Sequence, residues 1–211
     1  HNGSEPTIPS GYAVDTTELS DMEAVLDAEG IERAGIVAHS TGGAIAFNFG
    51  LHRPERVKRL ILLEPTLLTL LPEALRQQDR AARELVIAQA EAGDPLGAAS
   101  AFYTRALGQG WETRASVAML EQVRAAAPMI AAHNRALLSL KITPDEVRQL
   151  SPPALFVHGR RSTPVHAAIF ARIVELRPET QRLVVEDAGH AMHVSRPAPV
   201  NAAILDFLGV T

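Results

Sequence analysis

The sequence predicts an α/β domain with a mostly parallel sheet, helices on both faces of the sheet, and a helical insert in the middle of the chain. Two observations predict this class. Short apolar segments alternate with helical patterns on both sides of a long stretch that contains helical patterns only. The strand candidates are also mostly apolar throughout, as is typical of parallel strands that are covered on both faces.

The first part of the chain is expected to contain helix, strand, helix and strand in that order. Apolar residues recur at helical spacing over 17–29, and a short apolar strand follows at 33–38. The next helical pattern stops before Pro54, where proline disfavours a continuing helix. The apolar run at 57–65 is then the second strand of the sheet.

The middle of the chain changes character and divides the fold into two parts. Ala-rich helical patterns separated by Gly, Pro and Asp occupy most of residues 66–150. Strands and helices alternate again after residue 150, beginning with the apolar segment 154–159. We therefore expect a core formed by residues 1–65 and 151–211, with residues 66–150 inserted between them.

Composition limits the classes of partner and cofactor. The 211 residues include 46% hydrophobic residues, carry a net charge of −4 and contain no cysteine. Mild acidity argues against a nucleic-acid partner, and the absence of cysteine excludes disulfides and thiolate metal ligands. The most apolar segment, 60–71, is shorter than the ~20 residues of a membrane helix. We expect a cytoplasmic protein without membrane association, cofactor or metal, acting on a small-molecule substrate.

Polar residues with chemical potential follow the expected strands. Ligands of an open parallel sheet bind beyond the carboxyl ends of its strands. These ends carry Ser40, Glu64 and, after the last strand, His190. The motif "AHSTGG" around Ser40 has small residues two positions to either side, Ala38 and Gly42, as a sharp turn from strand to helix requires.

This motif resembles the nucleophile elbow of the α/β-hydrolase superfamily, and "DAGHAMHVSRP" is similar to the histidine loop of that family. The resemblance implies that Ser40 is a nucleophile and that His190 is its general base. It also implies that the backbone N–H of Thr41 is an oxyanion donor. The first glycine of the usual G-x-S-x-G pattern is replaced by Ala38.

The acid of the expected triad departs from the usual family pattern. Most members carry an aspartate in a pattern like "hGxxD", whereas this chain reads "HGRRS" and has Ser162 at that position. A variation known in the family places the acid at the end of the strand after the elbow helix, where "LILLEPT" has Glu64. Glu64 is therefore the expected acid, with Asp187 as a second candidate.

The resemblance also implies that the insert over 66–150 is a cap that covers the site. Its apolar character favours an uncharged, fairly hydrophobic substrate. His193 lies three residues after His190, but no further ligand spacing accompanies the pair, so we expect no metal site. The candidate pocket residues are the histidine before Ser40 and four large side chains of the insert: His39, Phe102, Tyr103, Trp111 and Met119. For the four side chains of the insert, packing in the core of the insert is the stronger interpretation.

The resemblance covers only the later part of the family fold. The segment "HNGSEP" at residues 1–6 looks like the end of the loop that follows the fourth strand of that fold. We therefore expect a preceding polypeptide segment to complete the sheet. The function implied is hydrolysis of an ester or related acyl bond through an acyl-enzyme. The alternatives are a non-hydrolytic enzyme of this fold, such as a lyase or cofactor-free haloperoxidase-like member, and a catalytically weak ligand-binding protein.

Overall fold

The structure is a computed structural model that describes residue 12 and residues 16–210, so the expected loop at residues 1–6 lies outside the described part. The chain divides into two compact units. One unit, here the sheet unit, contains residues 16–72 and 140–210. The other, here the helical unit, contains Glu73–Ser139. The expected insert of 66–150 encloses the helical unit, and its role as a cap stays a prediction.

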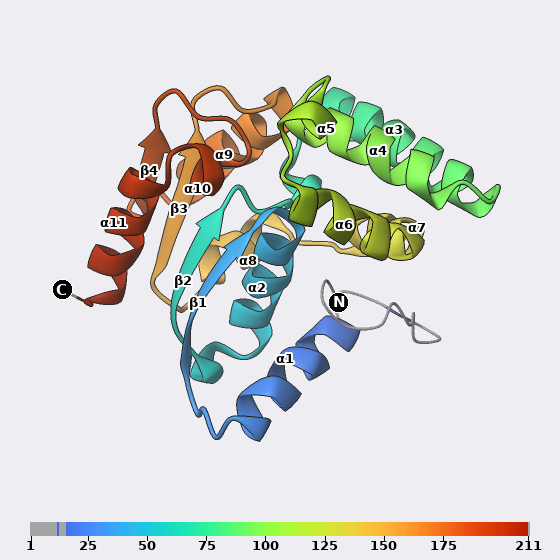
Figure 1. Ribbon diagram of the computed structural model, residues 1–211. Helices are drawn as coiled ribbons and strands as arrows, with labels where there is room; N and C mark the ends of the chain where they lie inside the picture. The colour runs from blue at the N-terminus through green and yellow to red at the C-terminus, as the bar shows by residue number, and fades with distance from the viewer. Residues whose placement is uncertain (1–11, 13–15, 211) are drawn as a thin grey trace. The chain divides into compact units, whose positions relative to one another are not determined.

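The sheet unit is built on four parallel strands in the order β1-β2-β3-β4 (Figure 1). The expected class of a parallel sheet flanked by helices is confirmed. The strands are β1 (Ala34–His39), β2 (Val57–Leu63), β3 (Ala154–Gly159) and β4 (Gln181–Val185). The helices of this unit are α1 (Thr17–Ala28), α2 (Ser40–His52), α8 (Pro144–Gln149), α9 (Pro164–Leu176), α10 (Met192–Ser195) and α11 (Pro197–Leu208), with short 3-10 turns at Pro54–Arg56 and Leu68–Leu70.

Helices cover both faces of the sheet, as Figure 1 shows for α2 and α11. On one face, Gly50 of α2 approaches the side chain of Leu60 in β2. On the opposite face, Ile61 packs in a buried cluster with Val200 and Phe207 of α11. The side chains of residues 60–63 in β2 are therefore buried on both faces, which explains why this part of the strand is continuously apolar, whereas Lys58 and Arg59 near its start are exposed.

The helical unit has a separate interior that combines apolar clusters with buried charge. Its helices are α3 (Glu73–Glu91), α4 (Pro95–Leu107), α5 (Trp111–Arg114), α6 (Val117–Ala126) and α7 (Ile130–Ser139), with a 3-10 turn at Ala127–Met129. Asp79 of α3 is buried between Arg83, at 2.6 Å, and Arg105, at 2.7 Å. Arg83 also donates a hydrogen bond of 2.9 Å to Asn134 of α7. These contacts link α3, α4 and α7. Because an unpaired charge is costly in an interior, loss of one partner would destabilise the others.

Two local features of the fold differ from the sequence-based expectation. Residues 113–127, one of the helical patterns of the expected insert, do not form a continuous helix, since α5 ends at Arg114 and α6 begins at Val117 with Ser116 as its N-cap. The short helix α8 was not expected, although Thr143 and Glu146 form a complete capping box at its start. Among the described residues, no helix combines the length and apolar character needed to cross a membrane.

The close packing of α2 on the segment after β2 depends on Gly43 and not on Gly42. A Cβ atom at Gly43 would lie 2.9 Å from Cα of Pro65, whereas one at Gly42 would have no described atom within 4 Å. The small residue expected at Gly42 is therefore not required by contacts in the sheet unit. The steric requirement falls one residue later in the helix.

We predict that Gly43→Ala lowers the free energy of unfolding by about 1–3 kcal/mol, because the added methyl group meets backbone that cannot move easily. Gly42→Ala is the matched control, and we expect it to leave stability unchanged or to raise it by up to about 1 kcal/mol through better helix propensity. Urea unfolding of both variants measures the difference. Equal losses in the two variants would contradict the packing argument.

Candidate active site

Ser40 lies at the junction of β1 and α2. The strand ends at His39 and the helix begins at Ser40. Ser40 has φ 56°, in the left-handed region that non-glycine residues seldom occupy. Such a conformation costs on the order of 1–3 kcal/mol and persists where the surrounding structure requires it. The strained turn places the serine side chain at the carboxyl end of the sheet, as the elbow motif predicts.

His190 meets Ser40 from the loop that follows β4. Its Nε2 atom lies 3.0 Å from Ser40 Oγ, within hydrogen-bonding distance. The ring is only 6% exposed. The two residues are 150 positions apart in the chain, and they meet because the carboxyl ends of β1 and β4 lie on the same edge of a parallel sheet.

Glu64 completes the arrangement from the end of β2. His190 Nδ1 lies 2.6 Å from Glu64 Oε2, and the glutamate side chain has no exposed surface. An ionised carboxylate only accepts hydrogen bonds, so Nδ1 carries the proton and Nε2 is free to accept the proton of Ser40. Asp187, the second candidate for the acid, is instead exposed and paired with Arg161. The geometry thus favours Glu64 over Asp187.

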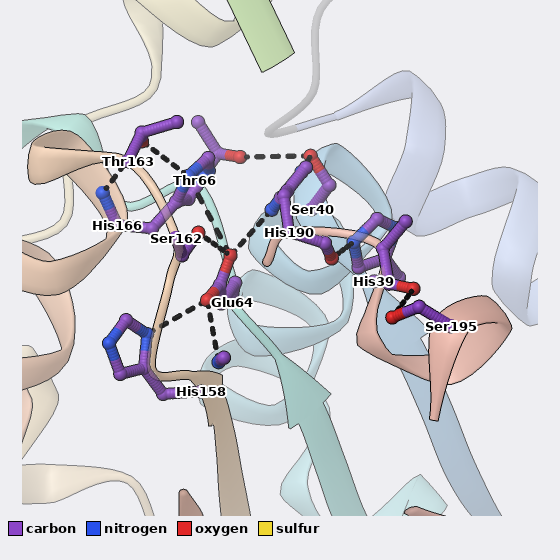
Figure 2. A network of polar contacts seen from close by, with 12 residues as sticks. His39, Ser40, Glu64, Thr66, His158, Ser162, Thr163, His166, His190 and Ser195 are labelled. Atoms are coloured by element: carbon purple, nitrogen blue, oxygen red, sulfur yellow. Dashed lines mark hydrogen bonds and ion pairs between the residues drawn. The ribbon is translucent and has the colours of Figure 1, made fainter. Parts of the chain in front are cut away.

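Three groups from the end of β3 and the turn after it also approach Glu64 (Figure 2). The backbone N–H of Gly159 donates to Oε1 at 2.9 Å, and Ser162 Oγ donates to Oε2 at 2.7 Å. His158 Nδ1 lies 2.8 Å from Oε1, with an N–H direction that is not aligned for a regular hydrogen bond. The sequence offered a signal for Ser162, which stands at the usual place of the family acid. No sequence signal marked the contact of His158.

The charge of Glu64 is stabilised despite its burial. Burial alone would raise the pKa of this carboxyl group. Four neighbours lower the pKa by a larger amount in total. They act through contacts with His158, His190 and Ser162 and through the nearby charge of His166. They hold the pKa of Glu64 well below its usual range. The carboxylate is therefore ionised at neutral pH.

Two further histidines pack on the His190 ring. His166, from the first turn of α9, stacks on it with ring centres 4.0 Å apart and planes inclined by 16°. The ring centre of His39 lies 4.4 Å from that of His190 and 4.5 Å from that of His193. His39 Nε2 donates a hydrogen bond of 2.9 Å to the backbone carbonyl of His190. That bond attaches the histidine loop to the elbow.

Burial, together with the nearby charges of His190 and His193, lowers the pKa of His39 to about 3. The ring is therefore neutral at ordinary pH. Its Nε2 proton is used in the bond to the His190 carbonyl. His39 is therefore an uncharged link between the end of β1 and the histidine loop.

Three ligand-type atoms of Glu64, His166 and His190 lie within 4.8 Å of one another and raise the question of a metal site. The lone pairs of imidazole lie in the ring plane, so the two nearly parallel stacked rings do not direct them at one common point. Glu64 and His190 are also hydrogen-bonded to each other. The described geometry fits a proton-sharing cluster better than a metal cage.

Two threonines lie close to Ser40. Thr41 is the second residue of α2, and the first amides of a helix have no acceptor within it, so its N–H is available as the expected oxyanion donor. Thr66 was not expected at the site. It is buried, its Oγ1 lies 3.4 Å from Ser40 Oγ, and its N–H donates to the Ser40 carbonyl at 3.1 Å.

The candidate pocket residues of the insert pack inside the helical unit. Trp111 is buried, and its ring lies 5.1 Å from that of Tyr103 between centres. Tyr103 also meets Phe102 edge to face at 5.4 Å, and Met119 packs on the cluster around Trp111. These contacts agree with the core reading of the four side chains. A role in substrate binding stays a prediction.

The neutrality of His39 predicts a dependence of stability on pH. An unfolded histidine takes up a proton near its ordinary pKa of 6.5, whereas folded His39 does so only near pH 3. The unfolded state therefore binds more protons between these values, and stability falls as the pH falls from about 6.5 towards 3. His39→Gln removes this contribution, so we expect a pH slope of the free energy of unfolding smaller by up to about 1.4 kcal/mol per unit. Urea unfolding over this range measures the slope, with exposed His52→Gln as control; a slope unchanged by His39→Gln would contradict the prediction.

Comparisons with known proteins identify the family of the chain. A family model described as alpha/beta hydrolase fold matches residues 1–197. Carboxylesterase YbfK of Bacillus subtilis is 26% identical over 96% of this chain, which spans 67% of that protein. The crystal structure of MGS-M2, an alpha/beta hydrolase enzyme from a deep-sea metagenome library, superimposes with a TM-score of 0.79 and 17% identity, over 97% of this chain and 75% of that one. A 2-hydroxy-6-oxo-6-phenylhexa-2,4-dienoate hydrolase of Comamonas testosteroni is 48% identical over 44 residues, 21% of this chain and 15% of that protein. The chain therefore belongs to the α/β-hydrolase fold family and is a hydrolase.

Proposed function

We propose that the chain is a serine hydrolase that cleaves an ester or related acyl bond of a small, largely apolar substrate. The observation that carries this proposal is the continuous chain of contacts from Ser40 Oγ to His190, at 3.0 Å, and on to Glu64, at 2.6 Å. A serine hydroxyl becomes a useful nucleophile when a positioned base accepts its proton. The carboxylesterase name of the Bacillus relative supports an ester as the substrate class.

The geometry supports a two-step reaction. Ser40 Oγ attacks the substrate carbonyl while His190 Nε2 takes the hydroxyl proton, and the Thr41 N–H stabilises the oxyanion that forms. His190 then returns the proton to the leaving alcohol, which leaves an acyl group on Ser40. Water attacks this acyl-enzyme in the second step, again with His190 as base, and releases the carboxylic acid.

Glu64 supports both steps through His190. Its hydrogen bond fixes the ring tautomer, with Nδ1 protonated and Nε2 facing the serine. Its charge stabilises the imidazolium that forms when the ring takes the proton. The burial of both side chains strengthens this interaction, because few waters screen the two charges.

We predict that a fluorophosphonate labels Ser40, and that Ser40→Ala abolishes both labelling and the hydrolysis of p-nitrophenyl esters. Glu64→Gln should lower turnover by roughly 10²–10⁴-fold, because an amide can neither carry the charge nor fix the tautomer reliably. A series of esters of increasing acyl length measures these rates and the preferred size of the substrate.

Asp187→Asn is the matched control for Glu64→Gln, since it neutralises an exposed carboxylate in the histidine loop. We expect turnover close to that of the unchanged protein. An unreactive Ser40, or equal losses in the two carboxylate variants, would contradict the proposed mechanism. Labelling without hydrolysis, with a non-hydrolytic product, would favour a lyase or haloperoxidase-like activity instead.

We further propose that a preceding polypeptide segment pairs with β1. Within the described residues β1 lies at the edge of the sheet, and Val37 in this strand is 48% exposed. An apolar edge strand with unpaired backbone groups favours the addition of another strand. The carboxylesterase relative is longer than this chain, which leaves room for such a segment.

Native mass spectrometry of the dissolved protein tests the added segment. We expect the folded species to carry further polypeptide, either covalently or as an associated chain, because an open β1 edge favours association. A single folded and monomeric species near 22.6 kDa would contradict this proposal.

A further inference from the structure

The end of β3 surrounds the carboxylate of Glu64 with donors. Oε1 receives the Gly159 N–H at 2.9 Å and faces His158 Nδ1 at 2.8 Å. Oε2 receives the Ser162 hydroxyl at 2.7 Å and His190 Nδ1 at 2.6 Å. Both oxygens therefore have contacts with residues at the end of β3 or in the turn after it, while only Oε2 faces His190 (Figure 2).

Glu64 needs this support for two physical reasons. Its side chain is completely buried, and a buried carboxylate is destabilised unless donors replace the lost water. Its backbone has φ 44°, a left-handed conformation that a non-glycine residue adopts only when its surroundings require it. The donors of β3 supply contacts that compensate for both costs.

From these contacts, and given the proposed serine-hydrolase function, we propose that Ser162 and His158 are positioning residues that hold the Glu64 carboxylate in the orientation that His190 requires. Neither side chain reaches the nucleophile in the described contacts. Both act through Glu64, and each holds a different oxygen.

Ser162 controls the direction of Oε2. The hydroxyl and His190 Nδ1 share this oxygen, so the serine occupies one acceptor direction and leaves another for the ring. Ser162 stands where most family members carry the acid itself. In this chain the same position thus keeps a contact with the acid through a hydroxyl group.

His158 limits rotation of the carboxylate about its last bond. Its ring stacks on Phe170 of α9, with centres 4.8 Å apart and planes inclined by 18°. That stacking fixes the direction of Nδ1, which lies 2.8 Å from Oε1. Together with the Gly159 N–H, it keeps Oε1 on the β3 side and so keeps Oε2 towards His190.

The first test compares Ser162→Ala with Ser162→Thr, which keeps the hydroxyl. We expect Ser162→Ala to lower kcat for p-nitrophenyl acetate roughly tenfold with little change in KM, because a hydrogen bond to a charged group is lost. Ser162→Thr should restore most of the rate. Ser151→Ala, an exposed serine before the other end of β3, is the matched control and should retain the full rate.

His158→Phe and His158→Gln make the same comparison for the other oxygen. Phenylalanine keeps the stacking on Phe170 but lacks the N–H. Because this N–H lies close to Oε1 without the alignment of a regular hydrogen bond, we expect a loss of kcat that is measurable but smaller than that of Ser162→Ala. Glutamine keeps a donor and should recover part of the rate. If His158→Phe retains the full kcat, His158 has no positioning role.

A double-mutant cycle separates positioning from general structural damage. If Ser162 and His158 act through the carboxylate, Ser162→Ala and His158→Phe should each cost little more in a Glu64→Gln background. The rate of fluorophosphonate labelling is the readout, since it remains measurable when turnover is low. Losses as large in the Glu64→Gln background as in the unchanged protein would overturn the proposal.

The proton on His190 Nδ1 gives a readout that does not need activity. In the unchanged protein we expect a strongly downfield NMR resonance for this proton, shifted by Ser162→Ala and by His158→Phe and lost in Glu64→Gln. An inert protein that shows these shifts would contradict the proposed function and keep the positioning inference. An active protein whose resonance is unaffected by the β3 variants would overturn the inference alone.

Discussion

The hydrogen bond between His190 and the buried carboxylate of Glu64 is the contact on which the candidate site depends. It places the Nδ1 proton on one side of the ring and leaves Nε2 facing Ser40 at 3.0 Å. If the proton were on Nε2 instead, that atom would have no lone pair with which to accept the proton of Ser40. The proposed chemistry therefore depends on how the protein keeps one carboxylate charged and correctly turned.

The parallel sheet brings the residues of the site together, because each of them lies at or just after the end of a strand. Ser40 follows β1, Glu64 follows β2, and the donors Gly159 and Ser162 lie at the end of β3 and in the turn after it. Because neighbouring parallel strands end at the same edge, residues 95 or more positions apart meet around one side chain. The strained backbones of Ser40 and Glu64 lie at this edge, where strain is tolerated because each residue directly follows a strand that fixes the residue before it.

Much of this arrangement could be predicted from local sequence patterns. The apolar runs and helical spacings predicted the strands and the flanking helices, and the residues at the strand ends predicted that Ser40, Glu64 and His190 would meet. Their catalytic roles stay predictions. The capping box at Thr143 and Glu146 is a sequence pattern that also indicates the start of α8.

The contacts of Ser162, His158 and Thr66 could not be predicted in the same way. Each depends on the register of one strand against another and on the rotamer of a buried side chain. A strand-end histidine such as His158 packs in a core in most proteins, so its type carries no information about Glu64. The steric role of Gly43 likewise follows from the approach of Pro65, a contact between α2 and the segment after β2.

The distribution of charge around His190 favours the transfer of a proton to its ring. Several imidazoles surround one carboxylate, and a second permanent positive charge beside His190 would oppose formation of the imidazolium in the reaction. Burial keeps His39 neutral, and its only described proton contact is to the His190 backbone carbonyl. The negative charge of Glu64 therefore does not have to be shared with that ring. It stays available to stabilise the proton that moves from Ser40 to His190, which is the step that the proposed hydrolysis requires.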